Sequence, residues 1–217
     1  MNDDGKMSLE EVRRHFGVGK LHESDLVADP LKQFASWYAD AEKACRFYPN
    51  HMTLSSVDDR GAPQSRIVLL KGVDAEGFVF FTNYQSRKGQ QLENNSAASI
   101  TFFWEELERQ VNISGSVSQV SAEESDEYFA SRERGSQIGA WVSRQSSEID
   151  DRSVLEEEKL RLTEVYEGKQ VPRPAHWGGY RLFPERIEFW QGQPDRLHDR
   201  LEYQLDKGEW IIHRLSP

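Results

Sequence analysis

The first residues that could do chemistry are Arg66 and Lys71, two cations that bracket the apolar run 67–70. Positive charges held on a rigid strand can bind an anion such as a phosphate. Because side chains alternate along a strand, the five-residue offset places the two cations on opposite faces, and convergence on one ligand requires a bulge or a strand end. An ordinary strand with solvated ends is the alternative.

A second candidate anion site begins at Ser86, where Arg87 and Lys88 follow in the first turn of an expected short helix that ends near Asn94 and Asn95. A helix N-terminus presents free N–H groups and the positive end of the helix dipole. Two cations there oppose the dipole and cost stability unless an anion compensates them. The pattern favours an anion site, and a solvated helix cap is the alternative.

A hydroxyl, a guanidinium and another hydroxyl occur at Tyr128, Arg132 and Ser136. Tyr128 and Arg132 are four residues apart, so they share one face of a helix, and Ser136 lies just beyond them. This set could clamp a phosphate. The end of an ordinary surface helix would have the same pattern.

The fourth group is Arg196, His198 and Arg200. If this segment is a strand, the alternation of side chains places all three on one face, where they repel one another. They would then need an anionic or electron-rich ligand, or counter-charges, and a solvent-facing strand is the alternative. Three residues just before the group could supply a flat wall and a close approach: Trp190, Gln191 and Gly192.

The charge balance restricts the class of partner. The 217 residues include 27 Lys+Arg and 37 Asp+Glu, for a formal net charge of −10, which argues against general nucleic-acid binding and against docking on anionic membranes. The acidity is uneven, because residues 61–90 carry a net charge of +2 whereas residues 121–170 carry −6. This distribution is compatible with a small phosphate pocket.

Several other kinds of site are excluded by the sequence. The lone Cys45 provides neither a disulfide framework nor a Cys-rich zinc site, and the 6 histidines show no paired metal-ligand spacing, so we expect no metal. Phosphate-binding Gly-rich loops and the G-x-S-x-G elbow are absent. No apolar run approaches the length of a membrane span, and residues 1–14 lack the apolar stretch of a signal peptide, so we expect a reduced, cytoplasmic protein.

These residues must be positioned by helices and strands that the apolar pattern predicts. A helix is expected over 31–44, where apolar and aromatic residues recur at helical spacing, and a short helix is possible at 9–16. Strand-like runs bounded by turn residues follow at 51–57, 64–72, 78–83, 99–104 and 110–120.

The second half of the chain returns to helices and then to strands. Ser121 and Glu124 form a capping-box pattern that opens a helix, and further helical segments are expected at 138–142 and 154–166. The final strands are expected at 179–183, 187–191, 197–204 and 210–215. Because strands come in sequential runs, we predict an α+β protein with a mostly antiparallel sheet or barrel and flanking helices.

Six ordered segments resemble the pyridoxine/pyridoxamine 5′-phosphate oxidase family: RIVLLK, FTNYQSRKGQQLENN, LERQVNISG, SQIGAWVSRQSS, IEFWQGQPDRLHDRLEY and WIIHRLSP. The resemblance extends from about Asp25 to Pro217. It implies an FMN-binding split β-barrel that forms a homodimer, with the flavin in clefts at the subunit interface. It also implies a single domain over 25–217, preceded by a flexible N-terminal segment over 1–24.

The resemblance assigns most of the candidate residues to FMN. These are Arg66, Ile67, Val68, Leu69, Leu70, Lys71, Phe81, Thr82, Arg87, Lys88, Gln110, Gln145, Ser146, Trp190 and Arg200. Among them, Arg87 and Lys88 would hold the FMN phosphate and Gln110 would contact the flavin ring. Some of these residues would come from the partner subunit.

The substrate residues follow in the same way. Lys71, Tyr128, Arg132 and Ser136 would hold the substrate phosphate, and Arg196 and His198 would face the pyridine ring as the catalytic pair. Arg13 would join them from an N-terminal lid. Relatives would have Arg-Arg-x-Tyr in this lid, and here Phe16 replaces the tyrosine, which puts a hydrogen-bonding role at that position in doubt.

The implied reaction is oxidation of pyridoxine or pyridoxamine 5′-phosphate to pyridoxal 5′-phosphate, with hydride transfer to FMN. O₂ then reoxidises the flavin and gives H₂O₂, as part of vitamin B6 biosynthesis and salvage. Two alternatives remain open. One is an FMN split-barrel oxidoreductase with another substrate, and the other is a non-catalytic carrier of flavin or of a vitamin B6 phosphate.

Overall fold

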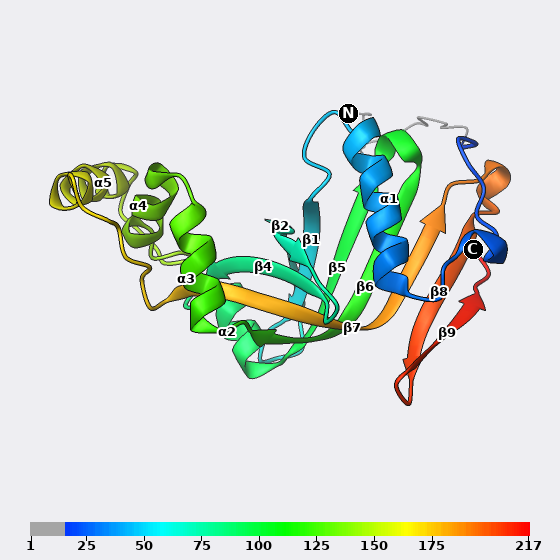
Figure 1. Cartoon of the computed structure of the whole chain (residues 1–217). Helices are drawn as coiled ribbons and strands as arrows, with labels where there is room; N and C mark the ends of the chain where they lie inside the picture. The colour runs from blue at the N-terminus through cyan, green and yellow to red at the C-terminus, as the bar shows by residue number, and fades with distance from the viewer. Residues whose placement is uncertain (1–15) are drawn as a thin grey trace, which may run out of the picture.

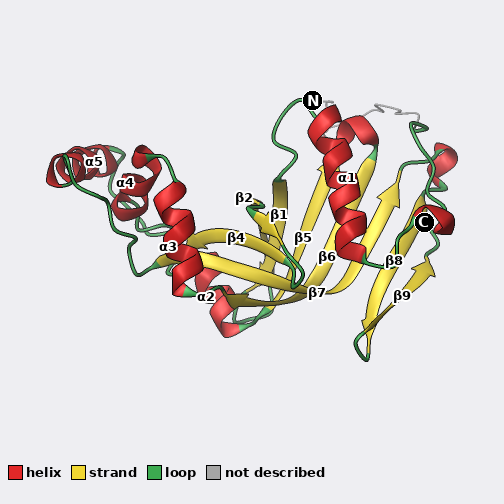
Figure 2. Cartoon of the chain, viewed as in Figure 1, coloured by secondary structure: helices red, strands yellow, loops and turns green. Residues whose placement is uncertain are grey.

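Residues 16–217 are the part of the chain that the computed structural model describes. They form one nine-stranded sheet in which all strand pairs are antiparallel, with helices around it (Figure 2). The strand order is β2-β1-β5-β6-β7-β4-β3, and β8 pairs with β7 and with β9. The strands are β1 (His51–Val57), β2 (Pro63–Leu69), β3 (Gly72–Val73), β4 (Phe78–Asn83), β5 (Ala97–Trp104), β6 (Arg109–Gln119), β7 (Trp177–Gln191), β8 (Asp199–Asp206) and β9 (Glu209–Arg214).

Strand β7 connects the two ends of the molecule, because its first half pairs with β4 and its second half with β8. The prediction of two separate strands at 179–183 and 187–191 is therefore wrong, because both ranges belong to one continuous strand, β7. A bulge at Glu185 accommodates Pro184 while pairing with β6 continues on both sides. Gly115 faces this bulge, and a Cβ there would lie 1.9 Å from the carbonyl oxygen of Phe183.

Helix α1 (Pro30–Ala44) lies across one face of the sheet (Figure 1). It begins as its sequence predicts, with the Asp29 carboxylate accepting two backbone N–H groups of the first turn and proline at the first helical position. Its buried aromatic side chains pack on the sheet, and the Trp37 ring lies 5.0 Å from that of Phe189. This contact is part of the main hydrophobic core.

The opposite face of β1, β2 and β5 carries exposed apolar side chains. Ile67 is 61% exposed and Phe103 is 53% exposed. Thr53 of β1 pairs in register with Ile67 of β2 and with Thr101 of β5, and Phe103 lies two residues beyond Thr101, so the exposed apolar groups belong to a single face. Within the described residues this face of the sheet remains accessible.

The remaining helices gather near the first half of β7 (Figure 1). They are α2 (Arg87–Asn94), α3 (Ala122–Ser131), α4 (Arg134–Val142) and α5 (Ser153–Val165). The expected capping pattern is confirmed, because the Ser121 hydroxyl accepts the backbone N–H of Glu124. A second, smaller core joins α3, α4 and α5 to β7 through Phe129, Ile138, Leu162, Val171 and Trp177.

Strands β8 and β9 and the C-terminus lie at the other end of β7 (Figure 1). The strand expected over 197–204 is wrong at its start, because residues 194–196 form a 3₁₀ turn and β8 begins at Asp199. The possible helix over 9–16 lies almost wholly outside the described residues. Among the residues described, no helix combines the length and apolar character needed to cross a membrane, and no cluster suited to a metal ion was found.

Candidate functional site

A cavity of about 490 Å³ lies where β2 and β4 meet α3 and its neighbouring loops. Its cationic, hydroxyl and amide lining residues are called the anion pocket here: Lys71, Lys88, Tyr128, Arg132, Ser136 and Gln145. The apolar wall is formed by Ile67, Val68, Leu69, Phe81 and Trp177, and the lining also includes Thr82, Asn83 and Glu133. The structure therefore brings together residues from three of the four groups that the sequence singles out.

Stacked aromatic rings support one side of the anion pocket. The Tyr128 ring is stacked on that of Phe81 with centroids 4.0 Å apart, and Trp177 is stacked beyond Phe81 at 5.5 Å. The Arg132 guanidinium lies 4.5 Å from the centre of the Trp177 ring. Cation–π contact of this kind holds the guanidinium plane in place.

Arg132 has an unsatisfied donor inside this setting. Its Nη1 is buried and has no hydrogen-bond partner among the described residues. Burial also lowers the pKa of the guanidinium. A buried unpaired N–H group is costly, and an anion in the pocket would satisfy it.

Lys88 lies at the start of α2, where the Ser86 hydroxyl caps the helix by accepting the Gly89 N–H. Its Nζ donates to Oε1 of Gln145 at 2.6 Å, and this partner is neutral. Burial, together with the positive charge of Arg66, lowers the pKa of Lys88 to about 8. A bound anion would raise the pKa of Lys88 again, because it would stabilise the charged ammonium group. The cations at this helix N-terminus predict such an anion.

Arg66 and Arg87 lie outside the lining of the anion pocket. Arg66 donates to the Ser56 hydroxyl at 2.6 Å and to Oε1 of Gln91 at 3.1 Å. Arg87 lines a separate cavity of about 300 Å³ beside Gln91, and its backbone N–H donates to the Ser146 hydroxyl. Gln91 is therefore the hydrogen-bond partner of Arg66 and lines the same small cavity as Arg87.

Several cations here have no carboxylate partner. Within residues 16–217, no ion pair joins a carboxylate to any of Arg66, Lys71, Arg87, Lys88 or Arg132.

Leu70 is a predicted site residue that does not line the cavity. It turns away from the cavity into the main core, where it is 7% exposed. Arg13 lies outside the described residues, so its predicted contact is not tested.

The fourth predicted group lies at the far end of β7. The Trp190 and His198 rings have centroids 4.6 Å apart, and the Phe16 ring meets both edge-on. The backbone N–H of Gln193 donates to Nδ1 of His198, which leaves Nε2 as the protonated nitrogen of a neutral ring. Arg196 is exposed, with a left-handed backbone at φ +63°, in a region that residues other than glycine rarely adopt.

The expectation that Arg196, His198 and Arg200 share one strand face is wrong, because only Arg200 belongs to β8. Arg200 has the counter-charge that the sequence argument required, since its Nε and Nη2 bind the Glu188 carboxylate at 2.8 and 3.0 Å. Gln110 is at the same end of the sheet, paired in register with Trp190.

The two groups are far apart within one chain. Trp190 is thirteen positions further along β7 than Trp177, which lies in the wall of the anion pocket. At about 3.3 Å per residue, this corresponds to roughly 40 Å. One copy of the chain therefore does not bring both groups to one small ligand.

Sequence reasoning did not single out three residues that support the candidate side chains. Ser56 and Gln91 bind Arg66, and the Gln193 backbone orients His198. The sequence did not predict Trp177 either, although its ring stacks on that of Phe81 in the cavity wall. None has a local sequence signal, because each acts through contacts between distant segments.

Comparison with known proteins decides the family. Residues 39–166 match the family described as pyridoxamine 5′-phosphate oxidase, and residues 177–217 match the pyridoxine 5′-phosphate oxidase C-terminal dimerisation region. The chain belongs to the pyridoxamine 5′-phosphate oxidase family. A pyridoxine/pyridoxamine 5′-phosphate oxidase from Paraburkholderia phytofirmans is 55% identical over 212 residues, covering 97% of this chain and 99% of the relative. One from a Cyanothece species is 52% identical over 211 residues, with the same coverage.

Solved structures agree with this family. The crystal structure of PhzG from Burkholderia lata 383, in complex with tetrahydrophenazine-1-carboxylic acid, has a TM-score of 0.86 and 32% identity and covers 91% of this chain and 98% of that chain. A pyridoxamine 5′-phosphate oxidase-related, FMN-binding protein from Nostoc punctiforme has a TM-score of 0.69 at 15% identity, covers 88% of this chain and all of that chain, and shows the fold alone. The family resemblance and the predicted split-barrel fold are thus confirmed.

Proposed function

We propose that this chain oxidises pyridoxine 5′-phosphate and pyridoxamine 5′-phosphate to pyridoxal 5′-phosphate in vitamin B6 biosynthesis and salvage. The observation that carries the proposal is the anion pocket, in which the buried Nη1 of Arg132 has no partner in the part of the chain that the structure describes. FMN would serve as hydride acceptor and O₂ would reoxidise it, giving H₂O₂. The proposal includes a reducing cytoplasmic location, which the lone Cys45 fits.

The residues present fit a flavin mononucleotide. Its phosphate would be held by Arg66, Arg87 and Lys88. The side chains of Arg66 and Lys88 have neutral hydrogen-bond partners in the described residues. The lowered pKa of Lys88 supports this assignment, because a neighbouring phosphate would stabilise its charged form. The rest of the predicted FMN set would contact the ring and ribityl chain, with Leu70 excepted because its side chain is in the main core: residues 67–69, Lys71, Phe81, Thr82, Gln145 and Ser146, together with Gln110, Trp190 and Arg200.

The substrate phosphate would bind in the same cavity between Lys71, Tyr128, Arg132 and Ser136. Arg132 offers a planar fork whose free donor matches a phosphate oxygen, and Lys71 adds a second charge. Binding energy from the phosphate would orient the reacting C4′ carbon, which lies at the other side of the pyridine ring. The aromatic wall would exclude water from that position.

Two copies of the chain are part of the proposal. Residues 177–217 match a dimerisation region, and the exposed apolar face at Ile67 and Phe103 offers a surface for a partner. Because Arg196 and His198 lie at the far end of β7, a second subunit would bring them to the anion pocket. Each FMN would then lie at the subunit interface of a homodimer.

Within that dimer, Arg196 would contact the substituents of the pyridine ring and His198 would assist through Nε2. The Gln193 N–H holds Nδ1, so the ring orientation is fixed before substrate binds. We therefore expect Arg196→Ala and His198→Ala to impair turnover more than FMN retention. Arg87→Ala/Lys88→Ala should lose FMN instead, and equal loss of FMN from both classes would refute this division of roles.

A second candidate function is oxidation of a cyclic carboxylic acid. It is favoured by the similarity to PhzG, whose structure contains tetrahydrophenazine-1-carboxylic acid. The cations of the anion pocket could bind a carboxylate as well as a phosphate. A non-catalytic carrier remains the third possibility, with the same pocket used for storage.

The test is to purify the protein, record flavin absorbance, and add pyridoxine 5′-phosphate under air while measuring aldehyde and H₂O₂. We expect a yellow protein that forms both products. Colour without either product would favour the carrier, and faster oxidation of a dihydrophenazine carboxylic acid would favour the second candidate. A protein that stays colourless after FMN is added would refute all flavin-dependent functions.

A further inference from the structure

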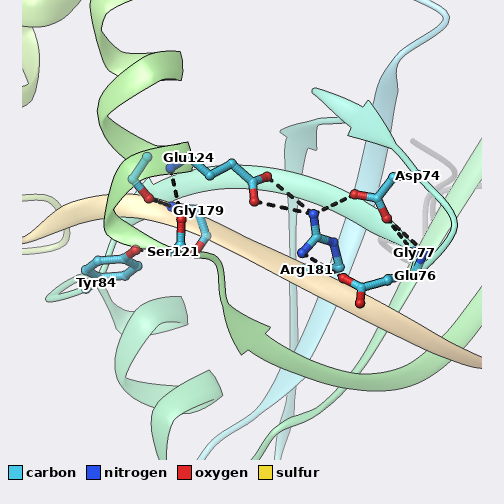
Figure 3. A network of polar contacts seen from close by, with 9 residues as sticks. Asp74, Glu76, Gly77, Tyr84, Ser121, Glu124, Gly179 and Arg181 are labelled. Carbon is cyan, nitrogen blue, oxygen red and sulfur yellow. Dashed lines mark hydrogen bonds and ion pairs between the residues drawn. The ribbon is translucent and has the colours of Figure 1, made fainter.

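Arg181 on β7 binds carboxylates from two separate elements (Figure 3). Its Nη2 lies 2.5 Å from Oδ2 of Asp74 and 3.3 Å from Oε2 of Glu124, and its Nη1 lies 3.2 Å from Oε2 of Glu76. Its side chain is only 15% exposed. Asp74 and Glu76 belong to the turn between β3 and β4, whereas Glu124 is in the first turn of α3.

The turn bound by Arg181 is rigidly connected to Lys71. The Asp74 carboxylate accepts the N–H groups of Glu76 and Gly77, which closes the turn. The Lys71 N–H donates to the carbonyl of Val79. Val79 is in turn the register partner of Arg181 on β7. Backbone pairing and the ion pair therefore fix the position of Lys71 relative to Arg181.

The other carboxylate is on the helix that carries the rest of the phosphate clamp. Glu124 lies one helical turn before Tyr128 and two turns before Arg132. Arg181 thus bridges the element that presents Lys71 to the element that presents Tyr128 and Arg132. These three side chains line one cavity.

The charges around Arg181 require a cation at this position. Three carboxylates surround one guanidinium, so Asp74, Glu76 and Glu124 would repel one another without it. Burial lowers the pKa of Arg181, but the hydrogen bond and charge of Asp74, with the two glutamates, raise it overall. Within residues 16–217 the buried Nε of Arg181 has no hydrogen-bond partner, which costs stability.

Helix α3 has other anchors, so loss of the bridge should shift the helix without detaching it. The Gly179 N–H donates to the Ser125 hydroxyl. Gly179 has no space for a side chain, because a Cβ would lie 2.7 Å from Cγ2 of Val120. The helix therefore stays in contact with β7 when only the ion pair is removed.

We propose that Arg181 is a positioning residue for the substrate phosphate, which sets the separation between Lys71 on one side and Tyr128 and Arg132 on the other. The proposal rests on the function proposed above. Arg181 itself does not line the cavity and would not touch the substrate. Its effect would come through the geometry of the clamp.

The test compares Arg181→Gln and Glu124→Gln with Asp126→Asn in the FMN-loaded enzyme. Asp126→Asn is the matched control, because it removes an ion pair of the same helix, made with Arg173 at 2.6 Å, without contact to the β3–β4 turn. Arg173 itself stays in this variant and keeps its hydrogen bond to the carbonyl of Trp177 in the cavity wall. Arg181→Gln and Glu124→Gln should raise KM for pyridoxine 5′-phosphate about tenfold and leave kcat within about threefold. Asp126→Asn should leave KM within about twofold.

Two further readouts separate the possible failures. Equilibrium binding of pyridoxal 5′-phosphate to the holoenzyme should weaken in Arg181→Gln in parallel with KM, and the double variant with Glu124→Gln should add little, since both remove one bridge. FMN content should not change. Unchanged KM and binding in Arg181→Gln, or an equal rise in KM for Asp126→Asn, would overturn the positioning role. A wild-type protein that neither oxidises nor binds these phosphates would overturn the proposed function itself.

Discussion

Replacement of Arg132 by methionine should separate stability from activity. The buried Nη1 of Arg132 has no hydrogen-bond partner among residues 16–217, and the guanidinium lies 4.5 Å from the centre of the Trp177 ring. An unpaired buried donor costs about 1–3 kcal/mol, and the cation–π contact returns about 0.5–2 kcal/mol. Because these two effects oppose each other, Arg132→Met should unfold with a free energy within about 2 kcal/mol of wild type.

Activity should respond very differently. If Arg132 makes two charge-assisted hydrogen bonds to the substrate phosphate, each contributes about 1.5–3 kcal/mol. Their loss should therefore lower kcat/KM by about 10²- to 10⁴-fold. Arg132→Lys keeps the charge but loses the planar fork and the stacking, so its loss should be intermediate.

The assay combines urea unfolding of the FMN-loaded protein with steady-state oxidation of pyridoxine 5′-phosphate. Arg134→Met is the control, because Arg134 donates to the backbone carbonyls of Lys169 and Tyr166 and does not line the cavity. It should lose stability and keep kcat/KM. The reasoning is refuted if Arg132→Met retains kcat/KM within tenfold, or if it unfolds more easily by over about 4 kcal/mol.

Three further predictions concern other parts of the chain. With FMN removed, Lys88 has a pKa of about 8, below its unfolded value, so the unfolded state binds more protons above pH 8. The free energy of unfolding of the apoprotein, measured in urea, should therefore rise as pH increases from 8 to about 10. Over the same pH range the affinity for FMN, measured by titration, should fall. Lys88→Met should abolish both trends. Phe16→Ala removes edge contacts to Trp190, so it should cost about 1 kcal/mol and increase acrylamide quenching of tryptophan fluorescence; unchanged quenching would contradict this packing. Gly115→Ala places a Cβ 1.9 Å from the Phe183 carbonyl oxygen, so it should destabilise the protein by about 3 kcal/mol or more, and a Tm equal to wild type would disprove the close approach at the bulge.

The elements that could be predicted from sequence are those with strong local signals. Helix α1 follows from the Asp29-Pro30 start and from apolar residues at helical spacing. Strands β1 and β4 have the predicted bounds, because turn residues mark both of their ends. The Ser121 cap was equally predictable from the capping-box pattern.

Other features depend on contacts that no local pattern contains. Pro184 and Glu185 have the composition of a turn, yet the sheet continues through them because Glu185 forms a bulge on β7 and pairing with β6 resumes on both sides. The start of β8 was misplaced because Asp195 and Arg196 adopt left-handed backbone conformations that their residue types do not predict. Pairing with β7 then begins only at Asp199.

The candidate site was predictable in its residue types and less so in its arrangement. Charge and spacing singled out Lys71 in one group and Tyr128 and Arg132 in another, and the structure brings all three to one cavity. The distance between this cavity and His198 was not predictable, because it depends on the length and continuity of β7. The predicted FMN and substrate roles of individual residues stay predictions.

The central claim is that the active site combines the anion pocket of one subunit with Arg196 and His198 of another. The most direct measurement is complementation, in which the inactive variants Arg132→Met and His198→Ala are co-expressed with different affinity tags and the mixed dimer is isolated. Each mixed dimer would contain one site with both mutations and one intact site, so it should recover about half of the wild-type activity per dimer. A mixed dimer no more active than either parent variant would contradict the account.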